Sequence, residues 1–368
     1  MRVLLVLRGN KKSLFGGGGA ERRFVRVIQY LKNHGVDDVK IICNKEMAIN
    51  FFKAGLIEDS DILVFPNRYL GIIGFNLWLI YKILKLKPDI IHLILIQRSL
   101  LPFYLFLLFY RKIFVVLTVA WAIYIKGDLD PITKFLSMIL FSRANIIDLL
   151  YPSAAKNNIF SKYSNKLRIT PCSFTDYNEY TSLNSKDNII SFVGRLIDQK
   201  RPFLFLEVIK SLKSEDYDLI KNWKFVILGD GKLKREIIDF IEKNDLRDVC
   251  ELSADYTSKN LLSRSKIFVT LQYPTNYPSQ ALLEAMACEN AVIATRDEDT
   301  KRIINDENGL LVNDSLLEIR DALKFLMLNE SLVSKLGKNA REFVLREHNI
   351  ERFSKYLLEI WEQGFNKK

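Results

Sequence analysis

The chain alternates between short apolar runs and longer segments with helical periodicity. The apolar runs of the first half have the length and composition of buried parallel strands. They read VLLVL, VKIIC, DILVF, DIIHLI and IFVVLTV, at residues 3–7, 39–43, 61–65, 89–94 and 113–119. Between the first two runs, residues 20–35 have a helical period and end on a glycine suited to stop a helix.

A second series of apolar runs follows a stretch with little pattern. That stretch, residues 169–187, is rich in Ser, Thr, Asn and Asp and is the natural domain boundary. The runs beyond it lie at 188–194, 223–229, 249–252, 266–271, 290–295 and 309–312, and the chain after 315 is helical in pattern. Strand–helix alternation predicts parallel sheets with helices on both faces. We therefore expect two doubly wound α/β domains, at 1–172 and 173–348. A C-terminal helix at 349–368 is expected to pack back toward the first.

Composition limits the classes of function. The chain has 368 residues and 49% hydrophobic residues, enough for two cores. Four cysteines without CxxC spacing and only three histidines argue against a zinc site. The net charge of +11 suits nucleotide phosphates or anionic lipid, although a lysine-rich proteome would explain it equally well. The cations are scattered and have no nucleic-acid motif, which argues against a nucleic-acid partner.

Two apolar segments, near the N-terminus and at 100–110, are too short to be a signal peptide core and a membrane span, respectively. The first is shorter than a signal peptide core and is typical of a first strand. The second is shorter than the ~20 residues that span a bilayer. The sequence therefore predicts a cytosolic chain.

Candidate chemistry lies where predicted strands end, because ligands of open parallel sheets bind at the carboxyl ends of the strands. After the first strand of the second domain, Gly194 permits a turn, and Arg195 and Lys200 are cations suited to a diphosphate. A solvated basic loop is the alternative. After the next strand, Gly229 and Gly231 permit the backbone to approach a ligand ahead of a helix, or simply form an ordinary turn.

Two further segments could contact the same ligand. The loop that contains Gly18 and Gly19 follows the first strand and opens a helix, but it matches neither a Walker A loop nor a dinucleotide fingerprint. A floppy surface loop is its alternative. In the run 276–295, Glu284 is the one carboxylate within the apolar stretch 281–288, and a buried carboxylate needs a partner. Vicinal ribose hydroxyls or an internal salt bridge would supply one. Pro278 and Ser279 suit a helix start, whose free N–H groups favour an anion.

The motifs FVGRL…QKRP, LGDGKL and NYPSQALLEAMAC, between residues 188 and 312, together resemble glycosyltransferase family 4. The resemblance implies the GT-B fold, two Rossmann-like doubly wound parallel-sheet domains facing across a cleft, with the acceptor in the first and the nucleotide-sugar in the second. It implies a retaining, metal-independent hexosyltransferase that needs no cofactor, since the nucleotide-sugar is a co-substrate. By this resemblance Arg195 and Lys200 hold the diphosphate, Glu284 holds the ribose, and Gly229 and Gly231 border the base. The remaining donor contacts would come from Gly18, Gly19, Gly194, Asn276, Tyr277, Pro278, Ser279, Gln280 and Ala281.

The sequence departs from the family pattern at two positions. Asn276 stands where the family often has a second Glu, and its amide could still bind sugar hydroxyls. The family commonly has a His after the fifth strand of the first domain, and this sequence has none there. His92, one strand earlier, is either a substitute or a buried strand histidine. The pair Asp128 and Asp130 has the pattern of a metal site of the other major glycosyltransferase fold. Here Asp130 and Pro131 are expected to start a helix instead.

The first domain should select the acceptor. Residues 69–87 and 100–112 mix aromatic side chains with cations, which suits a membrane interface, although packing against the sheet explains the same apolar residues. The membrane interpretation places the chain in the cytoplasm, at the inner face of the membrane. Its acceptor would be a saccharide or a lipid-linked saccharide for a surface polysaccharide. A catalytically silent partner subunit and a sugar-nucleotide 2-epimerase-like enzyme are the alternative functions.

Overall fold

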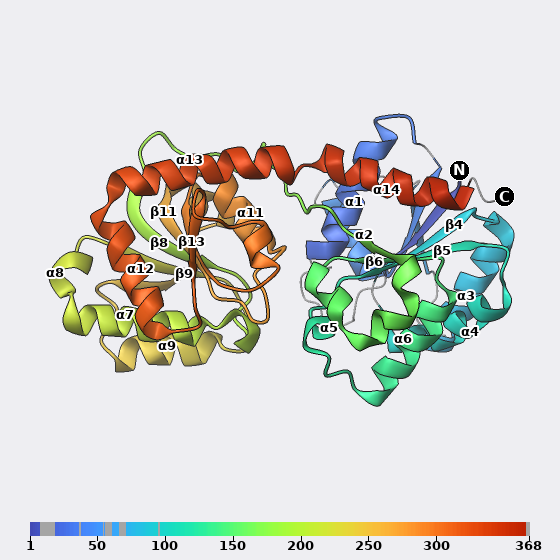
Figure 1. Cartoon of the computed structure of the whole chain (residues 1–368), viewed down its shortest axis with the longest axis horizontal. Helices are drawn as coiled ribbons and strands as arrows, with labels where there is room; N and C mark the ends of the chain where they lie inside the picture. The colour runs from blue at the N-terminus through green and yellow to red at the C-terminus, as the bar shows by residue number, and fades with distance from the viewer. Residues whose placement is uncertain are drawn as a thin grey trace. The chain divides into compact units, whose positions relative to one another are not determined.

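The computed structural model describes residues 1–7, 19–36, 38–53, 55, 61–65, 71–94 and 96–365. The chain divides into two compact units. The first consists of Met1–Pro171 and Ile350–Lys368, and the second of Cys172–Asn349 (Figure 1). The C-terminal helix therefore belongs to the first unit although it follows the second in sequence.

The first unit contains a parallel sheet of seven strands in the order β3-β2-β1-β4-β5-β6-β7. The strands are β1 (Val3–Val6), β2 (Val39–Cys43), β3 (Ile62–Val64), β4 (Ile90–Ile94), β5 (Phe114–Val119), β6 (Ile146–Leu149) and β7 (Leu167–Ile169). β1, β4, β5 and β6 are buried along their whole length, as expected for strands covered on both faces. The sequence did not predict β6 and β7, because a carboxylate and an arginine interrupt their short apolar runs.

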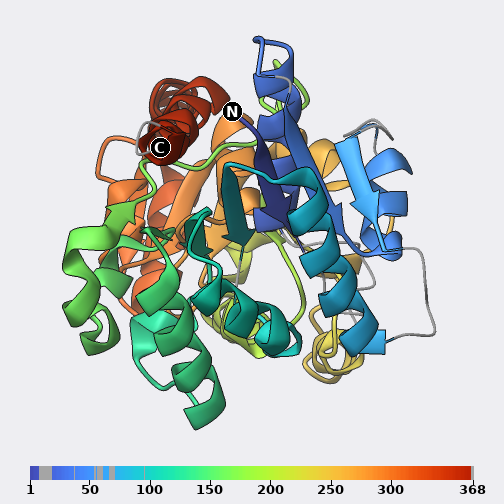
Figure 2. The ribbon, with the colours of Figure 1, turned by 90° about the vertical axis from the view of Figure 1, so that its right-hand side faces the viewer.

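Helices cover both faces of this sheet (Figure 2). They are α1 (Gly19–Lys32), α2 (Lys45–Lys53), α3 (Gly71–Leu86), α4 (Leu101–Phe109), α5 (Ile123–Lys126), α6 (Pro131–Arg143) and α14 (Ile350–Phe365). α3, α4 and α6 lie side by side over one face, with α4 in contact with both others. α1 and α14 contact each other, and α14 packs on β4 and β5. Successive strand residues point to opposite faces. Ile91 and Leu93 accordingly join the core that includes α3, α4 and α6, whereas His92 meets Trp361 of α14.

Short connections complete the first unit. Among the described residues of this unit, 3-10 segments lie at η2 (Arg98–Leu100), η3 (Pro152–Lys156) and η4 (Asn158–Lys166). Gly364 on α14 allows that helix to lie directly on β5, because a Cβ at that position would be 2.5 Å from the Phe114 ring. The helix therefore depends on a glycine for its close packing.

The second unit contains a parallel sheet of six strands in the order β10-β9-β8-β11-β12-β13. The strands are β8 (Asp187–Val193), β9 (Lys224–Leu228), β10 (Cys250–Ser253), β11 (Ser265–Thr270), β12 (Ala291–Thr295) and β13 (Gly309–Val312). The helices are α7 (Pro202–Glu215), α8 (Tyr217–Ile220), α9 (Lys234–Lys243), α10 (Ser258–Arg264), α11 (Gln280–Ala287), α12 (Leu316–Leu328) and α13 (Glu330–Glu347), and the 3-10 segments are η5 (Asp198–Lys200) and η6 (Thr300–Arg302). The predicted fold class, two doubly wound domains with parallel sheets, is confirmed.

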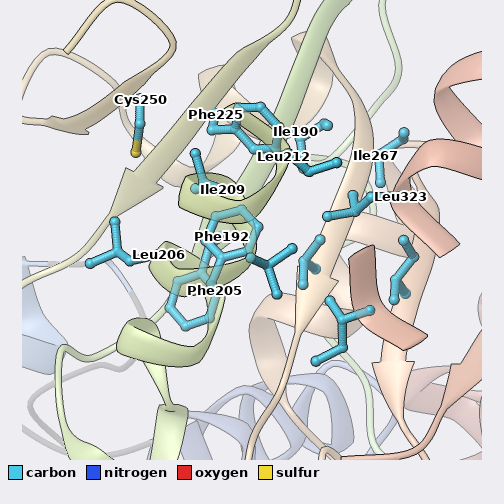
Figure 3. Close-up of a cluster of buried hydrophobic side chains, with 14 of the residues drawn as sticks. Ile190, Phe192, Phe205, Leu206, Ile209, Leu212, Phe225, Cys250, Ile267 and Leu323 are labelled. Carbon is cyan, nitrogen blue, oxygen red and sulfur yellow. The ribbon is translucent and has the colours of Figure 1, made fainter. Parts of the chain in front are cut away.

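The core of the second unit forms where α7 packs on β8 and β9 (Figure 3). Phe192 and Phe205 stack with centroids 5.5 Å apart, and Phe225 lies 6.1 Å from Phe205. Burying one such side chain contributes about 1.5–3 kcal/mol. Strand order reverses between β8 and β11, so the loops that follow these two strands diverge at the switch point of the sheet, where open α/β sheets bind ligands.

Two contacts fix the C-terminal end of α11. A Cβ on Gly337 of α13 would lie 2.2 Å from the Glu289 carbonyl oxygen, so only a glycine lets α13 approach this closely. The Lys186 ammonium donates hydrogen bonds to the carbonyl oxygens of Cys288 (2.6 Å) and Glu289 (2.7 Å). A cation at the C-terminus of a helix also complements its dipole. α11 is therefore held firmly at the end away from the candidate site.

Candidate functional site

The loops that follow β8 and β9 pack against each other directly. Their backbones continue the pairing of the two strands through hydrogen bonds from Gly194 N–H to the Leu228 oxygen (3.0 Å) and from Leu196 N–H to the Asp230 oxygen (2.9 Å). Leu233 N–H closes the set on the Leu196 oxygen (3.1 Å). The carboxyl ends of β8 and β9 thus carry one joined pair of loops.

Gly229 and Gly231 are required by this packing. A Cβ on Gly229 would lie 1.8 Å from the Gly194 oxygen, and one on Gly231 would lie 2.4 Å from the Leu196 oxygen. Backbone atoms cannot move aside as the end of a flexible side chain can. The structure therefore accounts for both glycines by contact between two loops, where the sequence suggested room for a ligand.

Lys200 joins the loop after β8 to the loop after β11. Its aliphatic chain lies over Gly194, 3.7 Å from the position a Cβ would take there. Its ammonium donates a hydrogen bond to the side-chain oxygen of Gln272. Burial, and then the nearby charge of Arg195, lowers the pKa of Lys200 to about 8. Sequence reasoning missed Gln272; its position directly after the apolar run 266–271 was the available signal.

Arg195 is the more accessible of the two predicted cations. It is exposed and, within the described part of the chain, it takes part in no ion pair. Other charges of the same segment are neutralised locally, since Asp198 pairs with Lys232 and Arg201 pairs with Asp314 at 2.6 Å. The site therefore presents one exposed guanidinium beside one partly buried ammonium, an arrangement that favours an anion with several oxygens.

Asn276 is buried and fully hydrogen-bonded within its own unit. Its side-chain oxygen accepts from the Thr270 hydroxyl and from Gln272 N–H, both at 2.8 Å. Its side-chain nitrogen donates to the Thr295 carbonyl oxygen (3.1 Å) and hydroxyl (2.9 Å). An amide has two donor hydrogens and two acceptor lone pairs. The expected direct contact with a donor sugar would therefore require Asn276 to break one of these bonds, so the structure favours a role in holding the loop.

The segment 277–281 forms the start of α11, as the sequence predicted. Ser279 is the N-cap residue, without a side-chain capping bond, and its N–H donates to the Asn276 oxygen at 2.8 Å. Pro278 precedes it, and Gln280 donates its side-chain amide to the Phe174 oxygen at 3.1 Å. Ala281 is half-buried, and Tyr277 is buried beside His348. A donor could therefore meet this segment through the backbone N–H groups of the first turn, which have no partners inside a helix.

Glu284 lies one turn further along α11 and is half-buried. The phenol of Tyr180 lies close to its carboxylate and 3.2 Å from the Ser258 hydroxyl. Burial, and after it the charge of Glu284, raises the pKa of Tyr180. Tyr180 is a second residue that sequence reasoning missed, since it lies in the weakly patterned boundary segment.

In the first unit, His92 is a structural residue. The Trp361 indole donates to its Nδ1 (3.2 Å), so Nε2 carries the proton and donates to the Thr118 hydroxyl (2.8 Å). That hydroxyl donates to the Asp148 carboxylate (2.7 Å). Burial lowers the pKa of His92 to about 3. A neutral, buried ring with both nitrogens occupied fits the buried strand histidine that the sequence suggested as the alternative.

The other predicted residues of the first unit divide into two groups. Gly18 lies outside the described residues, and Gly19 is the first residue of α1. Asp130 is the N-cap of α6, where its carboxylate accepts from Thr133 N–H at 3.1 Å and pairs with Arg98 at 2.6 Å. The helix start predicted at Asp130 and Pro131 is confirmed. Among the described residues there is no cluster of three side chains suited to a metal.

A solved structure with the same fold is known. HepE of Anabaena, in complex with UDP and glucose, superimposes with a TM-score of 0.77 at 13% identity, over 99% of this chain and 100% of that chain. At this identity the likeness shows the fold alone. The chain has the GT-B fold of two parallel-sheet α/β domains.

Sequence comparison narrows the class for the second unit. Residues 174–343 match the family model described as "Glycosyl transferases group 1". The second unit therefore carries a group 1 glycosyltransferase domain.

Two curated relatives show what such proteins act on. The GalNAc-alpha-(1->4)-GalNAc-alpha-(1->3)-diNAcBac-PP-undecaprenol alpha-1,4-N-acetyl-D-galactosaminyltransferase of Campylobacter jejuni is 30% identical over 180 residues, 48% of this chain and 49% of that protein. The poly(ribitol-phosphate) alpha-N-acetylglucosaminyltransferase of Staphylococcus aureus is 25% identical over 247 residues, 66% of this chain and 46% of that protein. The chain spans about half the length of the curated relatives it matches.

Proposed function

We propose that this protein is a glycosyltransferase that moves a sugar from a nucleotide-sugar to an acceptor hydroxyl. The observation that carries the proposal is the meeting of two loops and the start of a helix at the carboxyl ends of the strands of the second sheet. The loop after β8 brings Arg195 and Lys200, the loop after β11 brings Gln272, and α11 begins directly beyond Asn276. This end of the sheet lies within the residues that match the glycosyltransferase domain.

Each group at this end of the sheet has a role in the proposed reaction. The diphosphate takes charge-assisted hydrogen bonds from Arg195 and from Lys200, whose ammonium exchanges its neutral partner Gln272 for a phosphate oxygen. The first turn of α11 offers backbone N–H groups to the same anion. Glu284 accepts hydrogen bonds from the ribose hydroxyls. The donor site is thus assigned to the second unit and the acceptor site to the first.

The proposed transfer is retaining and uses neither a metal nor a cofactor. The bond from the anomeric carbon to the phosphate oxygen breaks, and a bond from the same face of that carbon to the acceptor oxygen forms. The departing phosphate takes the acceptor's proton, so no side chain of this protein has to act as base. Arg195 and Lys200 stabilise the negative charge that develops on the diphosphate, and preorganised groups of this kind supply much of the catalysis in such sites.

The acceptor is proposed to be a lipid-linked saccharide in the synthesis of a surface polysaccharide. The names of the relatives support this class, because one acts on an undecaprenol-linked saccharide and another on poly(ribitol-phosphate). The protein would then work in the cytoplasm, at the inner face of the cell membrane.

Calorimetric titration with UDP-, GDP-, ADP- and CMP-sugars tests the donor site. The variants Arg195→Ala and Lys200→Ala should each weaken binding of the recognised donor about 10- to 100-fold, since a hydrogen bond to a charged group contributes about 1.5–3 kcal/mol. Arg247→Ala is the matched control. Arg247 is an exposed arginine just before β10, at the amino ends of the strands, whereas the candidate site lies at their carboxyl ends. Circular dichroism verifies folding.

The outcomes separate the candidate functions. Failure of every donor to bind the folded protein contradicts the proposal, as does binding that both variants leave intact. Donor binding without sugar transfer to a lipid extract would identify the protein as a silent partner subunit. A changed sugar in the absence of any acceptor would identify an epimerase.

A further inference from the structure

We infer that the outer surface of α3, α4 and α6 is the face by which this protein docks on an anionic membrane. This inference rests on the proposed function, in which the acceptor is linked to a lipid. It is argued from residues of the first unit only. We define the apolar face by its exposed large side chains on these three helices: Ile73, Leu77, Tyr81, Leu84, Leu105, Phe109, Ile132, Phe135 and Met138.

The face begins with a stripe along α3. Ile73, Leu77, Tyr81 and Leu84 follow each other at intervals of four and three residues and are 71%, 63%, 54% and 46% exposed. Such intervals place side chains on one side of a helix. Phe75, Leu79 and Ile83, on the other side of the same helix, are buried in the core. α3 is thus apolar on both sides, and burial against the sheet explains only one of them.

The neighbouring helices extend this stripe into a broad surface. On α4, Phe109 is 87% exposed, and on α6, Phe135 is 57% exposed. α4 contacts both α3 and α6, and the three helices lie side by side in Figures 1 and 2. Soluble monomers rarely expose contiguous apolar surface of this kind without a binding role.

The charged side chains on the three helices themselves all have one sign. α3, α4 and α6 contain no Asp or Glu, and they carry Lys82, Lys85 and Lys134, with Arg111 and Lys112 just after α4. The Lys82 ammonium lies 5.6 Å from the Trp78 ring, and that of Lys85 lies 5.9 Å from the Tyr81 ring. The cations are thereby held beside the apolar side chains. Apolar and aromatic groups interleaved with lysine and arginine fit the boundary of a bilayer with anionic headgroups.

The same charges disfavour other occupants. Lysine is depleted at the centre of protein–protein interfaces, yet here it accompanies the apolar stripe of α3. A second copy of this chain would bring two cationic faces together, which costs free energy. Among the described residues there is also no helix of the length and hydropathy needed to cross a bilayer. We therefore assign the face to docking on the surface of the membrane.

Liposome flotation of the full chain tests the docking face. The protein should float with vesicles of phosphatidylethanolamine and phosphatidylglycerol, and far less with phosphatidylcholine alone. Added salt should reduce the bound fraction, because screening weakens the attraction to anionic lipid. The double variant Leu77→Ser/Phe109→Ser should lower the partition coefficient at least tenfold. Lys82→Glu/Lys85→Glu should remove the preference for phosphatidylglycerol.

The matched control is Phe325→Ser/Leu328→Ser on α12. These side chains are 50% and 67% exposed, comparable with the apolar face, but they belong to the second unit. This control should float like the unaltered protein. The inference is overturned if the unaltered protein does not float, or if Leu77→Ser/Phe109→Ser and Phe325→Ser/Leu328→Ser lose flotation equally. It is also overturned if light scattering shows a dimer that Leu77→Ser/Phe109→Ser converts to a monomer.

Donor titration on the same preparations keeps the two proposals distinct. Variants of the apolar face should retain the donor affinity of the unaltered protein, since the donor site lies in the second unit. Flotation that depends on the face without any donor binding would contradict the proposed function and leave the docking face standing. Donor binding without flotation would do the reverse.

Discussion

Replacing Asn276 by alanine tests whether this residue holds the loop that carries the donor site. The change removes all four side-chain hydrogen bonds of Asn276. The N–H of Gln272 and the carbonyl of Thr295 lose their partner inside the protein, whereas the two threonine hydroxyls can rotate toward others. If the loop then loosens, Gln272 no longer positions the Lys200 ammonium.

The expected loss in the free energy of unfolding follows from these four hydrogen bonds. A buried polar group left without a partner costs about 1–3 kcal/mol, and a typical hydrogen bond contributes about 1 kcal/mol net. Two stranded backbone groups and two rearranged hydroxyls together predict a loss of about 3–6 kcal/mol from the free energy of unfolding. A domain of this size has only about 5–15 kcal/mol in total. We expect Asn276→Ala to remain folded but to bind the donor at least tenfold more weakly.

Urea unfolding measures the loss of stability, and calorimetry at low temperature measures donor affinity of the folded fraction. Asn290→Ala is the matched control: Asn290 is equally buried and donates to the Leu262 and Ala285 oxygens, both at 2.9 Å, away from the loop. This control should lose about 2–3 kcal/mol, by the same reasoning, but keep its donor affinity. The reasoning is refuted if Asn276→Ala is as stable as the unaltered protein, or if both variants weaken donor binding equally.

Three further predictions concern the loops that follow β8 and β9. Gly229→Ala should destabilise the second unit by more than the ~1–3 kcal/mol usual for overpacking, because its Cβ would overlap a backbone oxygen. Gly194→Ala meets only lysine methylenes at 3.7 Å and should lower the free energy of unfolding little. Urea unfolding measures both variants, and equal losses would contradict the packing argument. The pKa of Lys200 is lowered to about 8 from 10.5, so its ammonium loses its proton as pH rises through 8. Donor affinity should therefore fall between pH 7 and 9. In Lys200→Arg it should be independent of pH over this range. Because the unfolded chain keeps this proton up to 10.5, the contribution of Lys200 to stability should rise with pH between about 8 and 10.5, and a contribution that falls there would contradict the burial argument.

The pattern of apolar residues was sufficient for most of the fold. It predicted eleven of the strands, the two parallel sheets and the helix starts at Asp130 and at Ser279. These features are local, because period and capping are set by residues within a few positions of each other. β6 and β7 were missed because a charged residue interrupts the short apolar run of each, and a local pattern then no longer indicates a strand. Asp148 accepts from a set of hydroxyls that only the assembled sheet and α14 bring together.

The sequence also placed the candidate residues at the ends of the correct strands, but it could not assign their contacts. Lys200 meets Gln272 only because β8 and β11 are neighbours in the sheet, and Tyr180 meets Glu284 only because the boundary segment returns to α11. A glycine that permits a ligand to approach and one that permits another loop to pack have the same signature along the chain. Periodicity and motif spacing determine which elements form and where polar groups emerge. Only tertiary structure decides which distant groups share a hydrogen bond, because that depends on the order of strands in the sheet.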